Sequence, residues 1–270
     1  MTRPLLVAAL LLAALVLRQP AIAEREMPVD LELVLAVDVS GSIDIYEARL
    51  QRQGYIDALT SPEVIRAITA GPLNRVAITY VEWAGNGHFR LLADWRLVDG
   101  SAAAHALAIQ LAGSPIMSGR RTSISGAMQF ALPLFEGNGY RGTRRIIDIS
   151  GDGPNNNGFP VLPARENAIA AGVGINGLVI LNQRPGPLGF PILEDLDIYY
   201  EECVIAGQGA FVLVADGFED FARAIKRKLV LEIAGAQIPA RPEVRRVAGY
   251  DCLVGERQLR EWMRNNPFDQ

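Results

Sequence analysis

The 270-residue sequence contains only two histidines and two cysteines, and this scarcity excludes several kinds of chemistry. It has no Cys-x-x-Cys pair, no His–Cys cluster and no P-loop, so the patterns of dithiol redox proteins, zinc sites and nucleoside triphosphatases are absent. A serine hydrolase needs a histidine base, and neither His88 nor His105 lies near a Gly-x-Ser-x-Gly elbow. We expect both histidines to be surface or packing residues.

Long apolar runs are also scarce. The one prominent run, residues 5–17, follows Arg3 and precedes Pro20 and the small-residue sequence Ala21-Ile22-Ala23. It is shorter than the roughly 20 residues that span a bilayer, and it has the layout of a secretory signal. We therefore predict a signal peptide over residues 1–23, with a retained anchor as the alternative, and no later membrane span. The mature protein is expected to be exported, either periplasmic or secreted.

Basic clusters are missing before the C-terminal segment. The net charge of −4 becomes −6 once Arg3 and Arg18 are removed with the signal. A mildly acidic protein is a poor match for a phosphate backbone, so no nucleic-acid partner is expected.

The predicted export affects how the two cysteines, Cys203 and Cys252, are interpreted. In an oxidising compartment a pair of cysteines favours a disulfide. Closing a loop of this length is worth roughly 4 kcal/mol in the chain-entropy model. The bridge would tie the C-terminal segment to the rest of the protein; the alternative is two unrelated thiols.

Strand-like and helix-like segments alternate after the signal, which predicts βαβ crossovers and a mostly parallel sheet with helices on both faces. Two strands joined across Gly85-Asn86-Gly87 predict one antiparallel edge strand. We predict a Rossmann-like three-layer α/β/α sandwich over residues 24–235, followed by a C-terminal extension over residues 236–270. The predicted strands are 31–38, 75–83, 88–98, 144–150, 175–181 and 209–214. The predicted helices are 43–59, a short one from Pro62, 101–112, 123–135, 162–171, 193–205, 218–234 and 255–264.

Five oxygen-bearing side chains stand where they can converge. Asp38 ends the first strand and is followed by Ser40 and Ser42, Thr122 precedes a helix, and Asp152 follows the strand 144–150. The carboxyl ends of parallel strands share one edge, where ligands usually bind. Carboxylate and hydroxyl oxygens suit Mg²⁺ or Mn²⁺ and disfavour zinc. The alternative is that these are ordinary turn residues, and Ser42 could cap the helix from Ile43.

The sequence Asp-Val-Ser-Gly-Ser (38–42) resembles the D-x-S-x-S signature of von Willebrand factor A domains. In that family a threonine and a later aspartate complete a metal-ion-dependent adhesion site, and Thr122 and Asp152 match those positions in order and spacing. Gly151 departs from the family, which usually has threonine there, and we expect this to matter little. The resemblance extends over residues 30–235 and looks closest to exported bacterial single-domain proteins of unknown function.

The resemblance implies a binding module whose divalent cation coordinates an acidic group, Asp or Glu, of a protein partner. Two other functions stay open: a metal-dependent hydrolase or phosphatase, for which no catalytic base is evident, and a degenerate site that binds by surface shape. The segment 183–202 leaves the same edge and could select the partner through Phe190, Glu194 and Asp195. Tyr199 and Tyr200 are expected to pack a helix on the sheet. Asn155-Asn156-Asn157 could contact a partner or satisfy a turn.

The motif Gly172–Gly177, GVGING, fits Gly-x-Gly-x-x-Gly but ends a helix and opens a strand. A dinucleotide loop has the opposite order, so we interpret Gly172 as a helix C-cap.

Overall fold

A computed structural model describes residues 26–182, 190–235 and 249–266. The expected signal peptide and residues 236–248 of the expected extension lie outside these residues. Within the described part of the chain, no helix combines the length and apolar character needed to cross a membrane.

A six-stranded sheet forms the middle layer, with strand order β3-β2-β1-β4-β5-β6. All neighbouring strands are parallel except the β2–β3 pair, which is the predicted antiparallel edge. The predicted fold class is confirmed. The strands are β1 (Met27–Asp38), β2 (Val76–Trp83), β3 (Phe89–Val98), β4 (Tyr140–Gly151), β5 (Gly174–Ile180) and β6 (Val212–Ala215).

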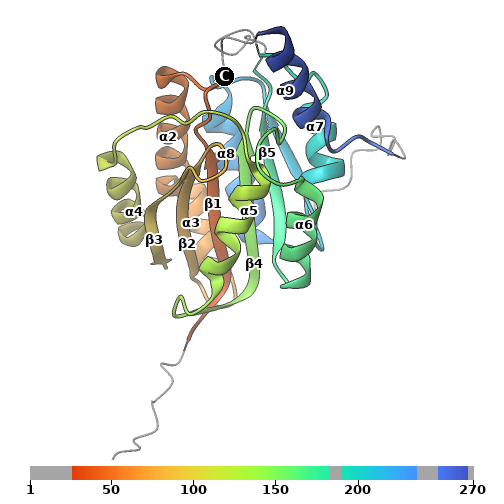
Figure 1. Cartoon of the computed structure of the whole chain (residues 1–270). Helices are drawn as coiled ribbons and strands as arrows, with labels where there is room; N and C mark the ends of the chain where they lie inside the picture. Colours follow the sequence, from red (N-terminus) through yellow and green to blue (C-terminus); the bar gives the residue numbers. More distant parts are fainter. Residues whose placement is uncertain (1–25, 183–189, 236–248, 267–270) are drawn as a thin grey trace, which may run out of the picture.

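Helices cover both faces of the sheet (Figure 1). One layer contains α2 (Ile45–Thr60), α3 (Pro62–Thr69), α4 (Ser101–Gly113) and α8 (Phe221–Ala234). The other contains α5 (Ile124–Ala131), which continues as a 3₁₀ turn to Phe135, α6 (Val161–Ala170) and α7 (Leu196–Tyr199), which continues as a π-helical turn over Tyr200–Val204. The last helix, α9 (Val254–Asn265), lies at the end of the molecule toward which β1 runs (Figure 1).

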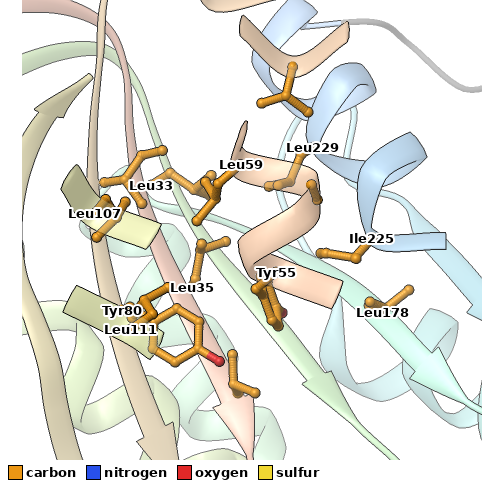
Figure 2. Close-up of a cluster of buried hydrophobic side chains, with 14 of the residues drawn as sticks. Leu33, Leu35, Tyr55, Leu59, Tyr80, Leu107, Leu111, Leu178, Ile225 and Leu229 are labelled. Atoms are coloured by element: carbon orange, nitrogen blue, oxygen red, sulfur yellow. The ribbon is translucent and has the colours of Figure 1, made fainter. Parts of the chain in front are cut away.

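The strand β1 divides the apolar core into two parts because its side chains alternate between the faces. Leu33 and Leu35 point to one face and pack with α2, α4 and α8 (Figure 2), whereas Val34 and Ala36 belong to the cluster on the other face. A strand buried on both faces needs a continuous apolar run, which this segment supplies. Burial on both sides fixes the register of β1, and with it the position of its carboxyl end.

The C-terminal helix is attached to the sandwich by the predicted Cys203–Cys252 disulfide, which the structure contains. The bond joins the π-helical turn after α7 to the residues just before α9. In addition, Tyr250 Oη donates to Asp195 Oδ2 at 3.0 Å. These two links place α9 beside the carboxyl edge of the sheet.

Candidate metal centre

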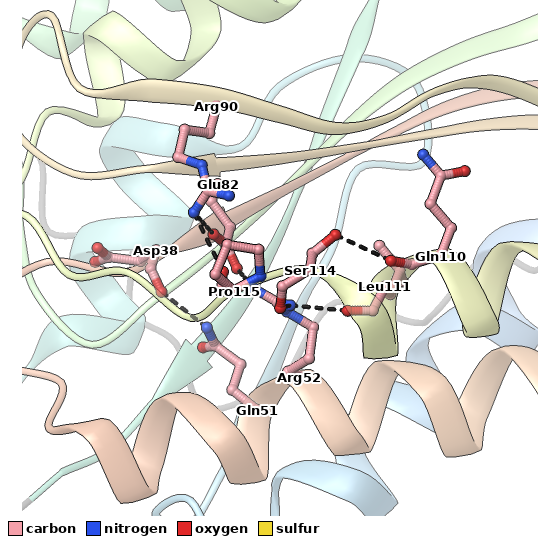
Figure 3. A network of polar contacts seen from close by, with 9 residues as sticks. All are labelled: Asp38, Gln51, Arg52, Glu82, Arg90, Gln110, Leu111, Ser114 and Pro115. Atoms are coloured by element: carbon pink, nitrogen blue, oxygen red, sulfur yellow. Dashed lines mark hydrogen bonds and ion pairs between the residues drawn. The ribbon is translucent and has the colours of Figure 1, made fainter.

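The carboxyl end of β1 places Asp38 inside the protein, fully buried. The main-chain N–H of Ser40 donates to Asp38 Oδ1 at 2.7 Å, and Gln51 Nε2 donates to the main-chain oxygen of Asp38 at 2.8 Å (Figure 3). The second carboxylate oxygen, Oδ2, is buried and has no hydrogen-bond partner among the described residues. Buried polar atoms usually have partners, so this oxygen has unused capacity to accept a hydrogen bond or to bind a cation.

A buried ionic network lies close to Gln51 and Asp38 at this edge of the sheet (Figure 3). Arg52 of α2 pairs with Glu82 near the end of β2, and Arg90 Nη1 lies 3.4 Å from the other oxygen of Glu82. Arg52 Nη1 also donates to the main-chain oxygen of Leu111 at 2.9 Å. These contacts join α2, α4, β2 and β3 directly beside Gln51 and so hold the residue that contacts Asp38.

The hydroxyl groups form a continuous chain next to Asp38. Ser40 Oγ lies 3.2 Å from Ser42 Oγ, and Thr122 Oγ1 donates to Ser40 Oγ at 3.4 Å. Ser42 Oγ donates to Asp152 Oδ1 at 2.7 Å. Side chains from three separate segments of the chain therefore meet in one small volume. Ser40 and Thr122 are buried, whereas Ser42 and Asp152 are half-buried and face outward.

The alternative role of Ser42 as a helix cap is wrong. Asp44 caps α2: its Oδ1 accepts from the N–H groups of Tyr46 and Glu47 at 2.8 Å each. The N–H of Asp44 in turn donates to Glu47 Oε2 at 2.9 Å, which completes a capping box. Because Asp44 satisfies the helix start, the hydroxyl of Ser42 is left for Asp152.

The loop 119–122 is held against β1 and β2 by its main chain. Gly119 N donates to the oxygen of Val39 at 2.9 Å, and Gly85 N donates to the oxygen of Arg120 at 3.0 Å. A Cβ at position 85 would lie 2.4 Å from that oxygen, so the approach requires glycine. Arg121 adopts a left-handed backbone with φ of 68°, which costs an arginine on the order of 1 kcal/mol. The surrounding hydrogen bonds stabilise this conformation and direct Thr122 inward.

The asparagine run beside Asp152 holds Thr122 from the other side. Asn156 Oδ1 accepts from Thr122 N at 2.9 Å, and Asn156 N donates to the oxygen of Thr122 at the same distance. Asn155 Oδ1 accepts from Ser125 N at 3.0 Å, and Asn157 Oδ1 accepts from Asn86 N at 2.7 Å. These three side chains therefore bind main-chain N–H groups of two other loops and of the start of α5, and they hold the position of Thr122.

Gly151 matters more than the sequence analysis expects. A Cβ at this position would lie 2.8 Å from Tyr200 Oη and 3.0 Å from Asp38 Oδ2. The hydroxyl of Tyr200 thus occupies space that a residue with a side chain would need, and it too is buried without a partner among the described residues. Tyr199 and Tyr200 are both buried in the core cluster, which confirms their predicted packing role, and nothing in the sequence shows that the Tyr200 hydroxyl lies beside Asp38.

Burial dominates the electrostatics of the two acids. It raises the pKa of Asp38 well above its usual range, and the neighbouring Asp152 raises it further. Burial also raises the pKa of Asp152 to about 6; the hydrogen bond from Ser42 opposes this shift and the charge of Glu47 adds to it. Among the described residues, neither acid forms an ion pair with a basic side chain. Two carboxylates in this position favour a bound cation, which would lower both pKa values.

The donor set fits a divalent cation. Two carboxylates balance its charge, three hydroxyls supply neutral oxygen ligands, and Asp38 Oδ2 lacks a partner. Within the described ranges, no group of three or more His, Cys, Asp or Glu side chains forms a metal-binding cluster.

A cavity of about 310 Å³ opens from the hydroxyl groups toward solvent. Its lining combines the polar residues Ser40, Ser42, Thr122 and Asp152 with the apolar residues Phe190, Leu193 and Trp262. The sequence analysis singles out Phe190 but misses Trp262, because nothing in an amphipathic helix tells where that helix packs. The C-cap of α6 is Ala171 and not the predicted Gly172, which follows it with a left-handed φ of 71°. Asp195, predicted to take part in partner choice, accepts a hydrogen bond from Tyr250.

Solved structures with the same fold include several von Willebrand factor A proteins. The proximal thread matrix protein 1 of the mussel byssus, with a zinc-occupied MIDAS motif, aligns with a TM-score of 0.57 and 16% identity, over 77% of this chain and 49% of that chain. A von Willebrand factor type A protein from Catenulispora acidiphila aligns with a TM-score of 0.54 and 13% identity, over 77% of this chain and 43% of that chain. The pilus adhesin SpaC from Lactobacillus rhamnosus GG aligns at 0.54 and 14%, over 78% and 31%.

Sequence identities this low show only that the folds are alike. The chain spans about half the length of the mussel protein and a smaller share of the other two proteins. No curated protein matches the sequence. A model of the family described as "Protein of unknown function (DUF1194)" matches residues 28–237. The match covers most of the chain, and the protein is therefore a member of the DUF1194 family with a von Willebrand factor A fold.

Proposed function

We propose that this protein is an exported, metal-dependent protein-binding module. Ser40, Ser42 and Thr122, together with Asp38 and Asp152, would hold Mg²⁺ or Mn²⁺. When bound, the cation supplies an electrophilic position that accepts a carboxylate from outside. The observation that carries the proposal is the chain of contacts that joins three hydroxyls to Asp152, next to the buried Asp38, whose Oδ1 accepts from Ser40 N.

The relatives in fold support an adhesion-type function. One of them is a pilus adhesin, and another is a byssus matrix protein with a metal in a MIDAS motif. For this chain the partner would present an Asp or Glu side chain at the cavity mouth, where Ser42 and Asp152 are accessible. We further propose a signal peptide over residues 1–23, a binding domain over 24–235 and an extension over 236–270.

The site itself tests this proposal through its hydroxyl ligands. Calorimetric titration of the mature protein with Mg²⁺, Mn²⁺ and Zn²⁺ should show one site per chain, and zinc is included because a relative in fold holds it. Thr122→Val removes an oxygen ligand with little change in volume and should weaken binding at least tenfold, which corresponds to 1.4 kcal/mol. Ser114→Ala, a hydroxyl outside the site that bonds to Gln110, is the matched control and should bind as the wild type does.

Two further measurements separate binding from catalysis. Capture of exported proteins on the immobilised domain, with and without a chelator, should yield a partner only when the metal is present. Phosphatase and esterase substrates should show no turnover; turnover that Asp152→Ala abolishes would replace the binding module by a metal-dependent hydrolase. Equal metal binding by the wild type and Thr122→Val would remove the site as drawn here.

A further inference from the structure

The C-terminal helix contributes to the lining of the cavity at the candidate metal centre. Trp262 of α9 lines the cavity together with Phe190 and Leu193, and Ser42 and Asp152 line it as well. The family model ends at residue 237, so α9 lies beyond the part of the chain that it matches. The part of the chain that the family model matches therefore contains the candidate metal ligands, whereas Trp262 lies in the segment that follows it.

The helix α9 is fixed tightly at its start. Asn155 Nδ2 donates to Glu256 Oε1 at 2.8 Å, so the loop that holds Thr122 also holds α9. A Cβ at Gly255 would lie 2.2 Å from the main-chain oxygen of Asn155, and only glycine allows this approach. With the Cys203–Cys252 bond just before it, the helix cannot move away from the site without breaking several contacts.

The lining around Trp262 is apolar and aromatic, with a basic neighbour. The rings of Phe190 and Trp262 lie 6.0 Å apart between centroids. Arg121 Cζ lies 5.9 Å from the centroid of the Trp262 ring, and Arg121 Nη2 lies 3.7 Å from Met263 Sδ. Arg120 also lines the cavity. A ligand that enters the cavity therefore meets oxygen atoms, aromatic rings and the basic side chain of Arg121.

The dimensions limit what can enter. A volume of about 310 Å³ holds a few side chains, whereas an α-helix with its side chains is about 10–12 Å across. An extended peptide fits this space, because neighbouring side chains can contact the polar and the apolar lining residues separately. The basic side chain of Arg121 in the lining favours an acidic segment over a neutral one.

We propose that α9 determines specificity, and that the ligand is an acidic peptide segment in which an Asp or Glu is flanked by a bulky apolar side chain. This inference rests on the proposed function for its carboxylate half. The carboxylate lies at the metal centre, and the apolar side chain packs on Trp262 and Phe190. Trp262 is the specificity-determining residue.

The test uses blocked tetrapeptides and the mature protein saturated with Mg²⁺. Acetyl-Gly-Phe-Asp-Gly-amide should bind about tenfold more tightly than the peptide with Ala in place of Phe, since burying a phenyl ring in an apolar wall is worth about that factor. The peptide with Asn in place of Asp should not bind measurably. In Trp262→Ala the preference for Phe over Ala should fall to about twofold, while Trp262→Phe should keep most of it. The control Glu261→Gln changes an exposed neighbour on α9 and should keep the tenfold preference.

The outcomes separate this inference from the proposed function. If Mg²⁺ binds and the Asp peptides bind with equal affinity whether Phe or Ala is present, the metal site stands and the role of α9 is wrong. The same conclusion follows if Trp262→Ala, with unchanged Mg²⁺ affinity, keeps the full preference. If Mg²⁺ does not bind, or if Asn and Asp peptides bind equally, the proposed function fails and this inference fails with it. If 3-phenylpropionate binds as tightly as the Phe-Asp peptide, the ligand is a small carboxylate and the peptide assignment is overturned.

Discussion

Two acids of the same segment, Asp148 inside β4 and Asp152 just after it, lie in contrasting surroundings. Asp148 is fully buried, and Lys228 Nζ of α8 lies 2.7 Å from its Oδ1. Glu232 lies 3.2 Å from the same nitrogen and accepts from Asn176 Nδ2 at 2.6 Å. Asp152 has hydroxyl neighbours and the buried acid Asp38 beside it, and neither forms an ion pair among the described residues.

The difference teaches which charges the fold neutralises by itself. Burying a carboxylate costs several kcal/mol unless a partner compensates it. At Asp148 the protein itself supplies a cationic partner, Lys228, which opposes the effect of burial without cancelling it, since the pKa of Asp148 is still raised to about 7. Asp38 and Asp152 have no such partner among the described residues, and a bound cation is the compensating charge that we propose for them. The comparison leads to four predictions, from the largest expected effect to the smallest.

The largest effect should follow removal of the positive charge of Lys228, which lies beside Asp148. Lys228→Met leaves Asp148 and Glu232 buried without their partner and should lower the free energy of unfolding by about 3–5 kcal/mol at pH 8. Urea unfolding at low temperature measures it. The matched control Lys226→Met changes a half-exposed lysine that lies 3.6 Å from Glu63, and it should cost at most about 1 kcal/mol. Equal losses in the two variants would remove the distinction between the regions.

The contribution of Asp148 to the free energy of unfolding should depend on pH. Burial, and then the charge of Glu232, raise the pKa of Asp148 to about 7 from 3.8, although Lys228 opposes the shift. The folded state therefore holds a proton that the unfolded state releases, and this contribution to stability is complete below about pH 4 and is lost as pH rises to about 7. The wild type should lose on the order of 2–4 kcal/mol relative to Asp148→Asn over this range. Parallel stability curves for the two proteins would contradict it.

The candidate metal centre around Asp38 and Asp152 should respond to added Mg²⁺. Mg²⁺ at about 100 times its dissociation constant should raise the free energy of unfolding of the wild type by about 2.7 kcal/mol. Lys228→Met should gain the same amount, because its change lies outside the metal centre. Asp38→Asn should gain nothing, and chemical denaturation with and without Mg²⁺ compares the three. A gain in Asp38→Asn that equals the wild-type gain would mean that the cation binds elsewhere.

The smallest effect concerns the glycine beside the site. Gly151→Ala places a Cβ against Tyr200 Oη and Asp38 Oδ2, and it should lower the free energy of unfolding by about 1–2 kcal/mol and weaken Mg²⁺ binding. Gly153→Ala is the control, since its Cβ would lie at an ordinary 3.8 Å from Thr122 Oγ1. Thermal melting of both variants checks the pair. If Gly151→Ala is as stable as Gly153→Ala, the crowding around Asp38 is not a constraint.

Much of the fold was predictable because its periodicity is local. The apolar run that ends at Asp38 and the turn at Gly85-Asn86-Gly87 predict β1 and the β2–β3 hairpin, and the structure contains both. Some side-chain roles were not predictable. The hydroxyl of Ser42 had two possible partners in the sequence, and only the capping box of Asp44 and Glu47 decides between them.

The sequence by itself determined the order of strands and helices, the pairing of two cysteines in a protein predicted to be exported, and the set of five oxygen-bearing residues. These features depend on residue type and spacing along the chain. Only the tertiary structure decided that Tyr200 fills the space beside Asp38, that Lys228 compensates Asp148, and that Trp262 faces the cavity. Such contacts join segments far apart in the chain, and their geometry depends on how whole elements pack, which no local pattern encodes.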